Sequence, residues 1–272
     1  MEDLKKGKKR VWKILYIVLV LGCLGCIGGM LMVLNQEEEV LPEVEVQQEA
    51  VEEVEVEEAE LAELPIDFES LWEINPEIYA WIEIPDTNIN YPIAQHEGED
   101  QSYYLTRDIY GNDSADGTIY TEHYNNKHFQ DPNTIIYGHN KRNGAMFHNV
   151  RYFAERELFE EHEDLYIYMP DKILKYQIIT CYEFDDRHLL AAYDCMNEEV
   201  FADYLEEIMN PRSMYTMVRE GCELTTEDKL VTLSTCVANK PNNRRLLQAV
   251  LLEEIEAEYK GAVDGTQSEE AN

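Results

Sequence analysis

The sequence predicts a mostly β protein with helices, in which the strands close or nearly close into a barrel. From Ile82 onward, short apolar or alternating runs are separated by turn residues, as expected for many short strands. Helical spacing of apolar residues is confined to a segment before these runs and to one late connection. Without its N-terminal region the chain retains about 200 residues, which fits one domain with a single core.

The first 34 residues resemble a membrane anchor. The run 14–34 carries no charge and would cross a bilayer core of roughly 30 Å as a helix. It is long for the apolar part of a signal peptide, about 7–15 residues, which favours an uncleaved transmembrane helix over a long signal peptide. Basic residues precede it, so we expect 1–13 to be cytoplasmic and the chain to be a single-pass protein of the cell membrane with the remainder extracellular; these are Lys5, Lys6, Lys8, Lys9, Arg10 and Lys13.

An acidic segment follows at 35–63, where glutamates alternate with Val, Ala and Leu and no Lys or Arg occurs. Like charges repel and extend a chain, so a stalk is the simpler interpretation and an acidic docking arm is the alternative. The formal net charge of the whole chain is −34, which makes nucleic acid an improbable partner because phosphate backbones would be repelled.

The folded domain is expected at 64–257, followed by a polar tail at 258–272. Apolar residues in 67–81 are interrupted at Asn75-Pro76, which predicts two short helices with the proline opening the second. Another helix is predicted over 197–209, before Pro211. Strands are predicted around 81–85, 90–93, 117–120, 134–137, 164–169, 174–180, 229–236 and 244–249.

Three strand ends carry reactive side chains. The apolar run 229–236 ends in Cys236, the run 134–137 is followed by Gly-His139, and the pair Arg244-Arg245 begins the next strand. A thiol is a poor nucleophile at neutral pH unless an imidazole or a cation activates it, so these residues together predict a catalytic thiol. The alternative for Cys236 is a buried structural cysteine, but its place at a strand end before a polar loop argues against that.

These motifs resemble a known family. Thr-Leu-Ser-Thr-Cys236, Thr-Ile-Ile-Tyr-Gly-His139-Asn and the strand 244–249 resemble the signature strands of the sortases, the cysteine transpeptidases of Gram-positive surfaces. The segments 67–85 and 88–93 resemble class B sortases in particular. The resemblance covers about 64–257 and implies an eight-stranded sortase β-barrel with N-terminal helices and a helix in the connection before the cysteine strand.

The resemblance also implies roles for individual residues. Cys236 would attack the carbonyl of a threonine in a sorting signal to form a thioacyl enzyme, while His139 protonates the departing amine. Arg244 would hold the substrate and stabilise the oxyanion, because the family's arginine lies five residues before a small residue, here Ala249. A register shifted by one would select Arg245 instead, since neighbouring strand residues face opposite sides.

Less specific assignments complete this site. Rival histidines for the base are His123, His128 and His148. Matches to stretches that line the class B groove predict substrate-binding roles for Ser234, Thr235, Tyr104 and Leu105, although each aromatic is equally compatible with ordinary core.

The remaining cysteines do not indicate a metal or cofactor. Cys23 and Cys26 fall inside the predicted span 14–34, where small packing residues are the simpler interpretation. The four cysteines outside the span show no CxxC pair or zinc-type Cys/His spacing, and we expect no cofactor. A disulfide through Cys236 would remove the nucleophile, so at most one bridge is compatible with function among Cys181, Cys195 and Cys222.

The predicted function is transfer of a surface protein or pilin, cleaved at its sorting signal, to an amine of a peptidoglycan precursor or of a pilin. Two alternatives are a Cys-His cell-wall peptidase that uses water as acceptor and an inactive tethered pilus-assembly module. The sequence does not choose the sorting signal or the acceptor amine.

Overall fold

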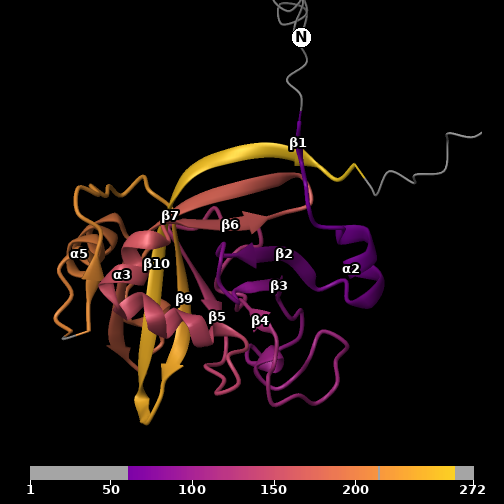
Figure 1. Cartoon of the computed structure of the whole chain (residues 1–272), viewed down its shortest axis with the longest axis horizontal. Helices are drawn as coiled ribbons and strands as arrows, with labels where there is room; N and C mark the ends of the chain where they lie inside the picture. The colour runs from indigo at the N-terminus through magenta and orange to yellow at the C-terminus, as the bar shows by residue number, and fades with distance from the viewer. Residues whose placement is uncertain (1–60, 214, 261–272) are drawn as a thin grey trace, which may run out of the picture. The chain divides into compact units, whose positions relative to one another are not determined.

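The computed structural model describes residues 61–213 and 215–260 (Figure 1). The predicted cytoplasmic segment 1–13, the predicted span 14–34 and most of the predicted stalk 35–63 lie outside these residues. Most of the predicted tail 258–272 lies outside them too.

The expected membrane localisation has to be corrected. Among residues 61–213 and 215–260, no helix is long and apolar enough to cross a membrane. The segment 14–34, on which the single-pass localisation depended, is not part of the described chain. The structure therefore gives that localisation no support, and it is withdrawn.

Strands dominate the described chain, and short helices connect them. The strands are β1 (Ala62–Glu63), β2 (Ile78–Glu83), β3 (Asn90–Ala94), β4 (Ile119–Tyr120), β5 (Asn133–Tyr137), β6 (Asp164–Tyr168), β7 (Lys172–Asp185), β8 (Met217–Val218), β9 (Leu230–Val237) and β10 (Lys240–Glu258). The helices are α2 (Phe68–Ile74), α3 (Arg156–Glu161), α4 (Leu189–Ala192) and α5 (Glu198–Met209), with 3-10 helices η1 (Tyr103–Leu105) and η2 (Phe147–Ala154).

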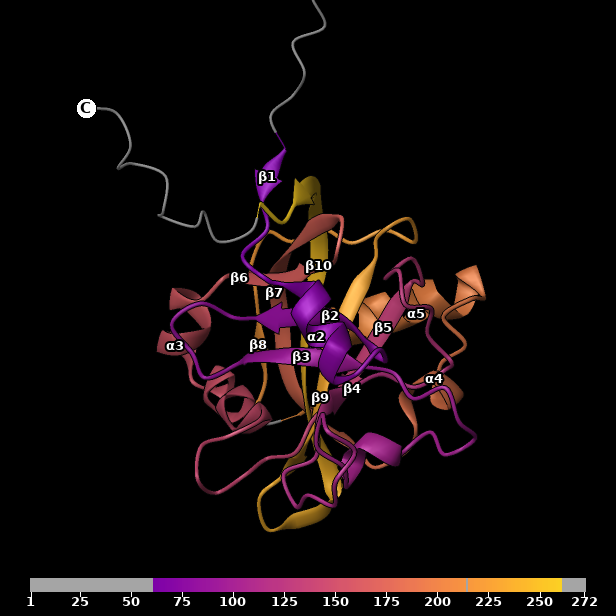
Figure 2. The same cartoon turned by 90° about the vertical axis from the view of Figure 1, so that its right-hand side faces the viewer.

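The strands form a closed barrel. Neighbouring strands follow the order β10-β9-β5-β4-β3-β2-β6-β7, and β7 pairs again with β10, so eight strands make a ring. β1 and β8 extend it at β10 and β7. The long curved strands β7 and β10 cross most of the molecule and close the ring (Figures 1 and 2). The predicted eight-stranded barrel is confirmed.

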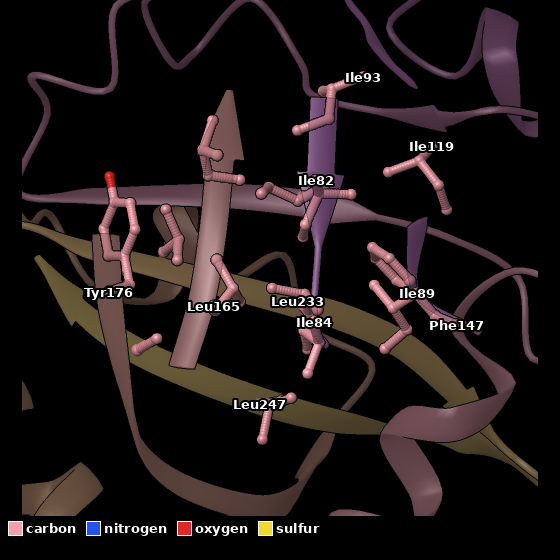
Figure 3. Close-up of a cluster of buried hydrophobic side chains, with 14 of the residues drawn as sticks. Ile82, Ile84, Ile89, Ile93, Ile119, Phe147, Leu165, Tyr176, Leu233 and Leu247 are labelled. Atoms are coloured by element: carbon pink, nitrogen blue, oxygen red, sulfur yellow. The ribbon is translucent and has the colours of Figure 1, made fainter. Parts of the chain in front are cut away.

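Two apolar clusters lie on opposite faces of the barrel wall. Alternation along β9 sends Val231 and Leu233 into the main core, where they meet side chains from β2, β6 and β10 (Figure 3). Leu230, which precedes Val231 on the strand, belongs to a second cluster with Phe201 and Tyr204 of α5. Helix α5 therefore covers the outer face of the wall, as the predicted helix over 197–209 requires, and Asn197 caps it.

The second of the two predicted N-terminal helices is absent, and that part of the prediction was wrong. Asp67 caps α2, which ends at Ile74, and Asn75 donates its backbone N–H to Leu71. The chain then enters β2 at Ile78 and pairs with β3 and β6. The barrel buries this apolar segment as a strand, which overrides a helical spacing that is too short to be decisive.

Candidate active site

Parallel pairing of β5 and β9 brings two of the predicted residues to one edge. The register runs from Asn133 opposite Leu230 to Tyr137 opposite Ser234. Because parallel strands end at the same edge, the segments that follow them lie side by side. The Thr235 hydroxyl donates to the Gly138 carbonyl at 2.7 Å. His139 and Cys236 follow directly after this connection.

Strand β10 adds the arginine. Arg244 is directly opposite Cys236 in the antiparallel ladder, and such pairs share a face with Cβ atoms roughly 4.5–5.5 Å apart. Arg244 lines the same pocket as Cys236, and its Nη1 donates to the carbonyls of Pro241 and Asn243 at 3.0 and 3.2 Å. Its guanidinium is therefore held by its own loop at the pocket wall.

Arg245 has a different environment, as strand alternation requires. It is buried, and its Nη2 donates to Glu183 at 2.8 Å while Nη1 donates to the Tyr215 carbonyl at 3.2 Å. It does not line the pocket that Cys236 and Arg244 share. The geometry thus favours Arg244 over Arg245 for a role in that pocket.

One pocket on the outer face of the barrel collects these residues. Its walls come from η1, the ends of β5 and β9, the start of β10 and the chain between β7 and α4. It is lined by Leu105, Tyr120, Ile135, Tyr137, Gly138, His139, Phe184, Asp186, Arg187, His188, Leu189, Ser234, Thr235, Cys236, Arg244 and Leu246. An apolar interior with a few polar groups suits an extended peptide.

The predicted substrate-binding residues divide into two groups. Ser234, Thr235 and Leu105 line the pocket. Tyr104 does not: its side chain is 1% exposed and packs with Ile78, Ala94 and Tyr120. The Leu105 carbonyl accepts a hydrogen bond from Nε2 of His139 at 2.8 Å, so this residue touches the candidate base as well as the pocket.

Of the rival histidines, His148 lies near the site but outside the pocket lining. Its Nδ1 is 3.0 Å from the side-chain oxygen of Asn140, and the Asn140 amide donates to the Cys236 carbonyl at 2.9 Å. His123 instead contacts Gln101, and His128 is not among the lining residues. Of His139 and its three rivals, only His139 lines the pocket that contains the thiol.

Sequence reasoning missed a polar group in the pocket wall. Nε2 of His188 lies 2.6 Å from the Glu122 carboxylate, and the Tyr137 hydroxyl donates to the same carboxylate at 3.1 Å. Burial, with the nearby carboxylate, raises the pKa of both Tyr120 and Tyr137, so these hydroxyls stay protonated. The available signal was the polar run 185–188, which follows the predicted strand 174–180 after four residues.

The four cysteines of the described chain are free thiols, and only Cys236 is exposed. Burial raises the pKa of Cys181 to about 12 and that of Cys195 to about 11, and it raises the pKa of Cys222 as well. These three thiols stay protonated at neutral pH. Within residues 61–213 and 215–260, no group of three or more His, Cys, Asp or Glu side chains is placed to hold a metal ion.

A barrel with a thiol, an imidazole and a guanidinium in one pocket is the arrangement of a thiol-dependent acyl-transfer enzyme. A family model described as a sortase domain matches residues 82–252. The chain belongs to the sortase family and is a cysteine transpeptidase.

Similar proteins agree with the predicted class. Sortase B of Listeria monocytogenes serovar 1/2a is 28% identical over 188 residues, covering 68% of this chain and 74% of that relative. The structure of Clostridium perfringens sortase B has a TM-score of 0.59 and 28% identity, over 69% of this chain and 100% of that one. A Bacillus anthracis protein described as similar to sortase B has a TM-score of 0.59 and 30% identity, over 72% and 88%. The resemblance to class B is confirmed.

Proposed function

We propose that the enzyme cleaves a C-terminal sorting signal after its threonine and transfers the released protein to an amine. Cys236 is the nucleophile, His139 the proton donor and acceptor, and Arg244 the group that holds the substrate backbone and stabilises the oxyanion. The acceptor is an amine of a peptidoglycan precursor or of a pilin. Residues 64–257 form the catalytic domain in this proposal.

The observation that supports the proposal is the shared pocket. Cys236, His139 and Arg244 come from three separate segments of the chain, and all three side chains line one pocket. Ser234, Thr235 and Leu105 supply further walls where the substrate backbone would lie. Cys236 is the exposed thiol, whereas the other three cysteines of the described chain are buried or half-buried. An inactive module would not need such an exposed thiol.

The test is a transfer assay with synthetic sorting peptides, both NPQTN-like and LPxTG-like. Each peptide is incubated with the enzyme and one amine: triglycine, a peptidoglycan stem peptide or a lysine-bearing pilin peptide. Mass spectrometry then separates transfer products from hydrolysis products. We expect amide-linked transfer with at least one pair, and Cys236→Ala and His139→Gln should each abolish it.

Cys222→Ala is the matched control, because it removes a half-buried thiol that does not line the pocket. It should retain transfer. Hydrolysis with every amine would instead indicate a Cys-His peptidase. Transfer by Cys236→Ala would contradict the assignment of the nucleophile.

A further inference from the structure

His139 is fixed by a hydrogen bond that determines which of its nitrogens can react. Its Nε2 lies 2.8 Å from the backbone carbonyl of Leu105. A carbonyl oxygen accepts hydrogen bonds and cannot donate them, so Nε2 must carry the proton. In the neutral ring the lone pair is then on Nδ1, because neutral imidazole has one protonated nitrogen.

The Leu105 carbonyl is itself held in place by its surroundings. In η1 the Leu105 N–H donates to Ser102 at 2.8 Å, and the Thr118 N–H donates to the Tyr104 carbonyl at 2.9 Å. Gly117, at φ +64°, packs against both carbonyls: a Cβ built there would lie 2.7 Å from each oxygen. Only glycine allows so close an approach in this conformation.

The side chain of Tyr104 anchors η1 to the segment before β2. Its buried hydroxyl donates to the Glu77 carboxylate at 2.5 Å and accepts from the Asn75 amide at 2.7 Å. Glu77 also accepts from the Glu97 backbone N–H at 2.9 Å and faces Nδ1 of His96 at 3.0 Å. Partial burial opposes ionisation of Glu77, but these hydrogen bonds outweigh it and lower its pKa. The carboxylate therefore stays an acceptor for Tyr104.

We propose that Nδ1 of His139 is the atom that exchanges protons with the substrate, and that Tyr104 is a positioning residue that fixes this tautomer through the Leu105 carbonyl. This rests on the proposed function of His139. Tyr104, expected from the sequence to bind substrate, thus acts on the candidate base from outside the pocket.

The proton transfers balance on one nitrogen. As the Cys236 sulfur bonds to the threonine carbonyl carbon and the peptide C–N bond breaks, the imidazolium gives its Nδ1 proton to the departing amine. When the acceptor amine bonds to the same carbon and the C–S bond breaks, the thiolate leaves and the amine's proton passes to Nδ1. The other proton stays on Nε2 throughout, where it is donated in the hydrogen bond to the Leu105 carbonyl.

The direct test is nitrogen NMR of the full chain labelled with 15N-histidine, without substrate. The His139 signals are assigned by their loss in His139→Gln. The wild-type protein should show Nε2 protonated and Nδ1 unprotonated above the pH at which the ring becomes neutral. An Nδ1-protonated neutral ring would overturn the inference, even in a fully active transpeptidase, whereas transfer by His139→Gln would overturn the proposed function whatever the tautomer.

Tyr104→Phe tests the anchor, since it removes the hydroxyl and keeps the buried ring. We expect kcat to fall roughly ten- to 100-fold with KM nearly unchanged, because a small displacement of a catalytic group is enough for such a loss. The His139 signals should show a mixture of tautomers. Gly117→Ala, which must push the Leu105 carbonyl away, should change the tautomer in the same way.

Tyr103→Phe is the matched control, because within the described residues the neighbouring Tyr103 makes ring contacts but no hydroxyl hydrogen bond. It should leave the tautomer and kcat unchanged. A Tyr104→Phe enzyme with wild-type melting temperature, tautomer and kcat would contradict the positioning role. Equal losses of kcat in Tyr103→Phe and Tyr104→Phe would also contradict it.

Discussion

Arg244 and Arg245 are neighbours in the chain but belong to different faces of β10. Arg244 faces the pocket beside Cys236, and Arg245 pairs with Glu183 where both side chains are 10% exposed. Glu183 keeps a second partner, because the Lys240 ammonium lies 2.7 Å away. Replacing Arg245 should therefore affect stability, whereas replacing Arg244 should affect catalysis.

Arg245→Gln should lower the free energy of unfolding by about 2–3 kcal/mol, because it leaves a mostly buried carboxylate with one partner fewer. Arg244→Gln should leave that free energy nearly unchanged and should depress kcat/KM by about 100-fold or more, through loss of oxyanion stabilisation. Urea unfolding and the peptide transfer assay measure the two effects. The assignment fails if Arg244→Gln transfers at the wild-type rate.

At the scale of elements, the site depends on where β5 and β9 end. The Gly138 N–H donates to the Ser234 carbonyl at 3.2 Å, which continues the ladder one residue beyond β5 before His139 leaves it. Gly138 also lies against the core: a Cβ there would approach Ile119 at 2.5 Å and Phe147 at 2.7 Å. The residue before His139 is thus glycine for reasons of packing.

Gly138→Ala should destabilise the protein by about 1–3 kcal/mol, the usual cost of overpacking a core. Because the strain falls on the residue that precedes His139, turnover should fall as well. Thermal melts and the transfer assay provide the measurements. Adding Phe147→Leu should recover part of both losses, because the smaller side chain makes room for the added methyl group. A Gly138→Ala enzyme as stable and active as wild type would contradict the close packing around Gly138.

The strand ends were the part of the site that the sequence could predict. Apolar runs ending in Gly138-His139 and Cys236 indicated the pairing, and alternation on a strand allowed only one of the two arginines into the pocket. The buried position of Tyr104 was not predictable, because its partner Glu77 lies 27 residues away in the chain. The same holds for His188, whose partner Glu122 is 66 residues away.

The helix predicted over 76–81 was wrong for a similar reason. Residues from Ile78 onward form β2, because pairing within the barrel overrides the local helical spacing.

At the scale of the whole molecule, closure of the barrel by β7 and β10 fixes the pocket from both sides. β10 carries Arg244, and β7 leads into the segment that contributes Asp186 and His188. The loop with η1 covers a third side and is tied to the start of β2 through Glu77. Stability of the molecule and geometry of the site are therefore linked at Glu77.

This link predicts a pH dependence of stability. The folded protein lowers the pKa of Glu77 below its ordinary value of 4.5, so the stabilisation is present above that pH and is lost as the pH falls through the folded pKa. Below pH 4.5, the melting temperature of the wild-type protein should therefore fall more steeply with decreasing pH than that of Glu77→Gln. The exposed Glu73→Gln is the control and should follow wild type. Parallel curves for wild type and Glu77→Gln would contradict the link.

The most direct test of the account is the identity of the acylated residue. The full chain is mixed with a sorting peptide without any amine, quenched in acid, digested and mapped by mass spectrometry. We predict a thioester of the peptide's threonine on Cys236 that disappears when an accepting amine is added before the quench. An adduct on Cys181, Cys195 or Cys222, or an adduct that persists in Cys236→Ala, would contradict the account.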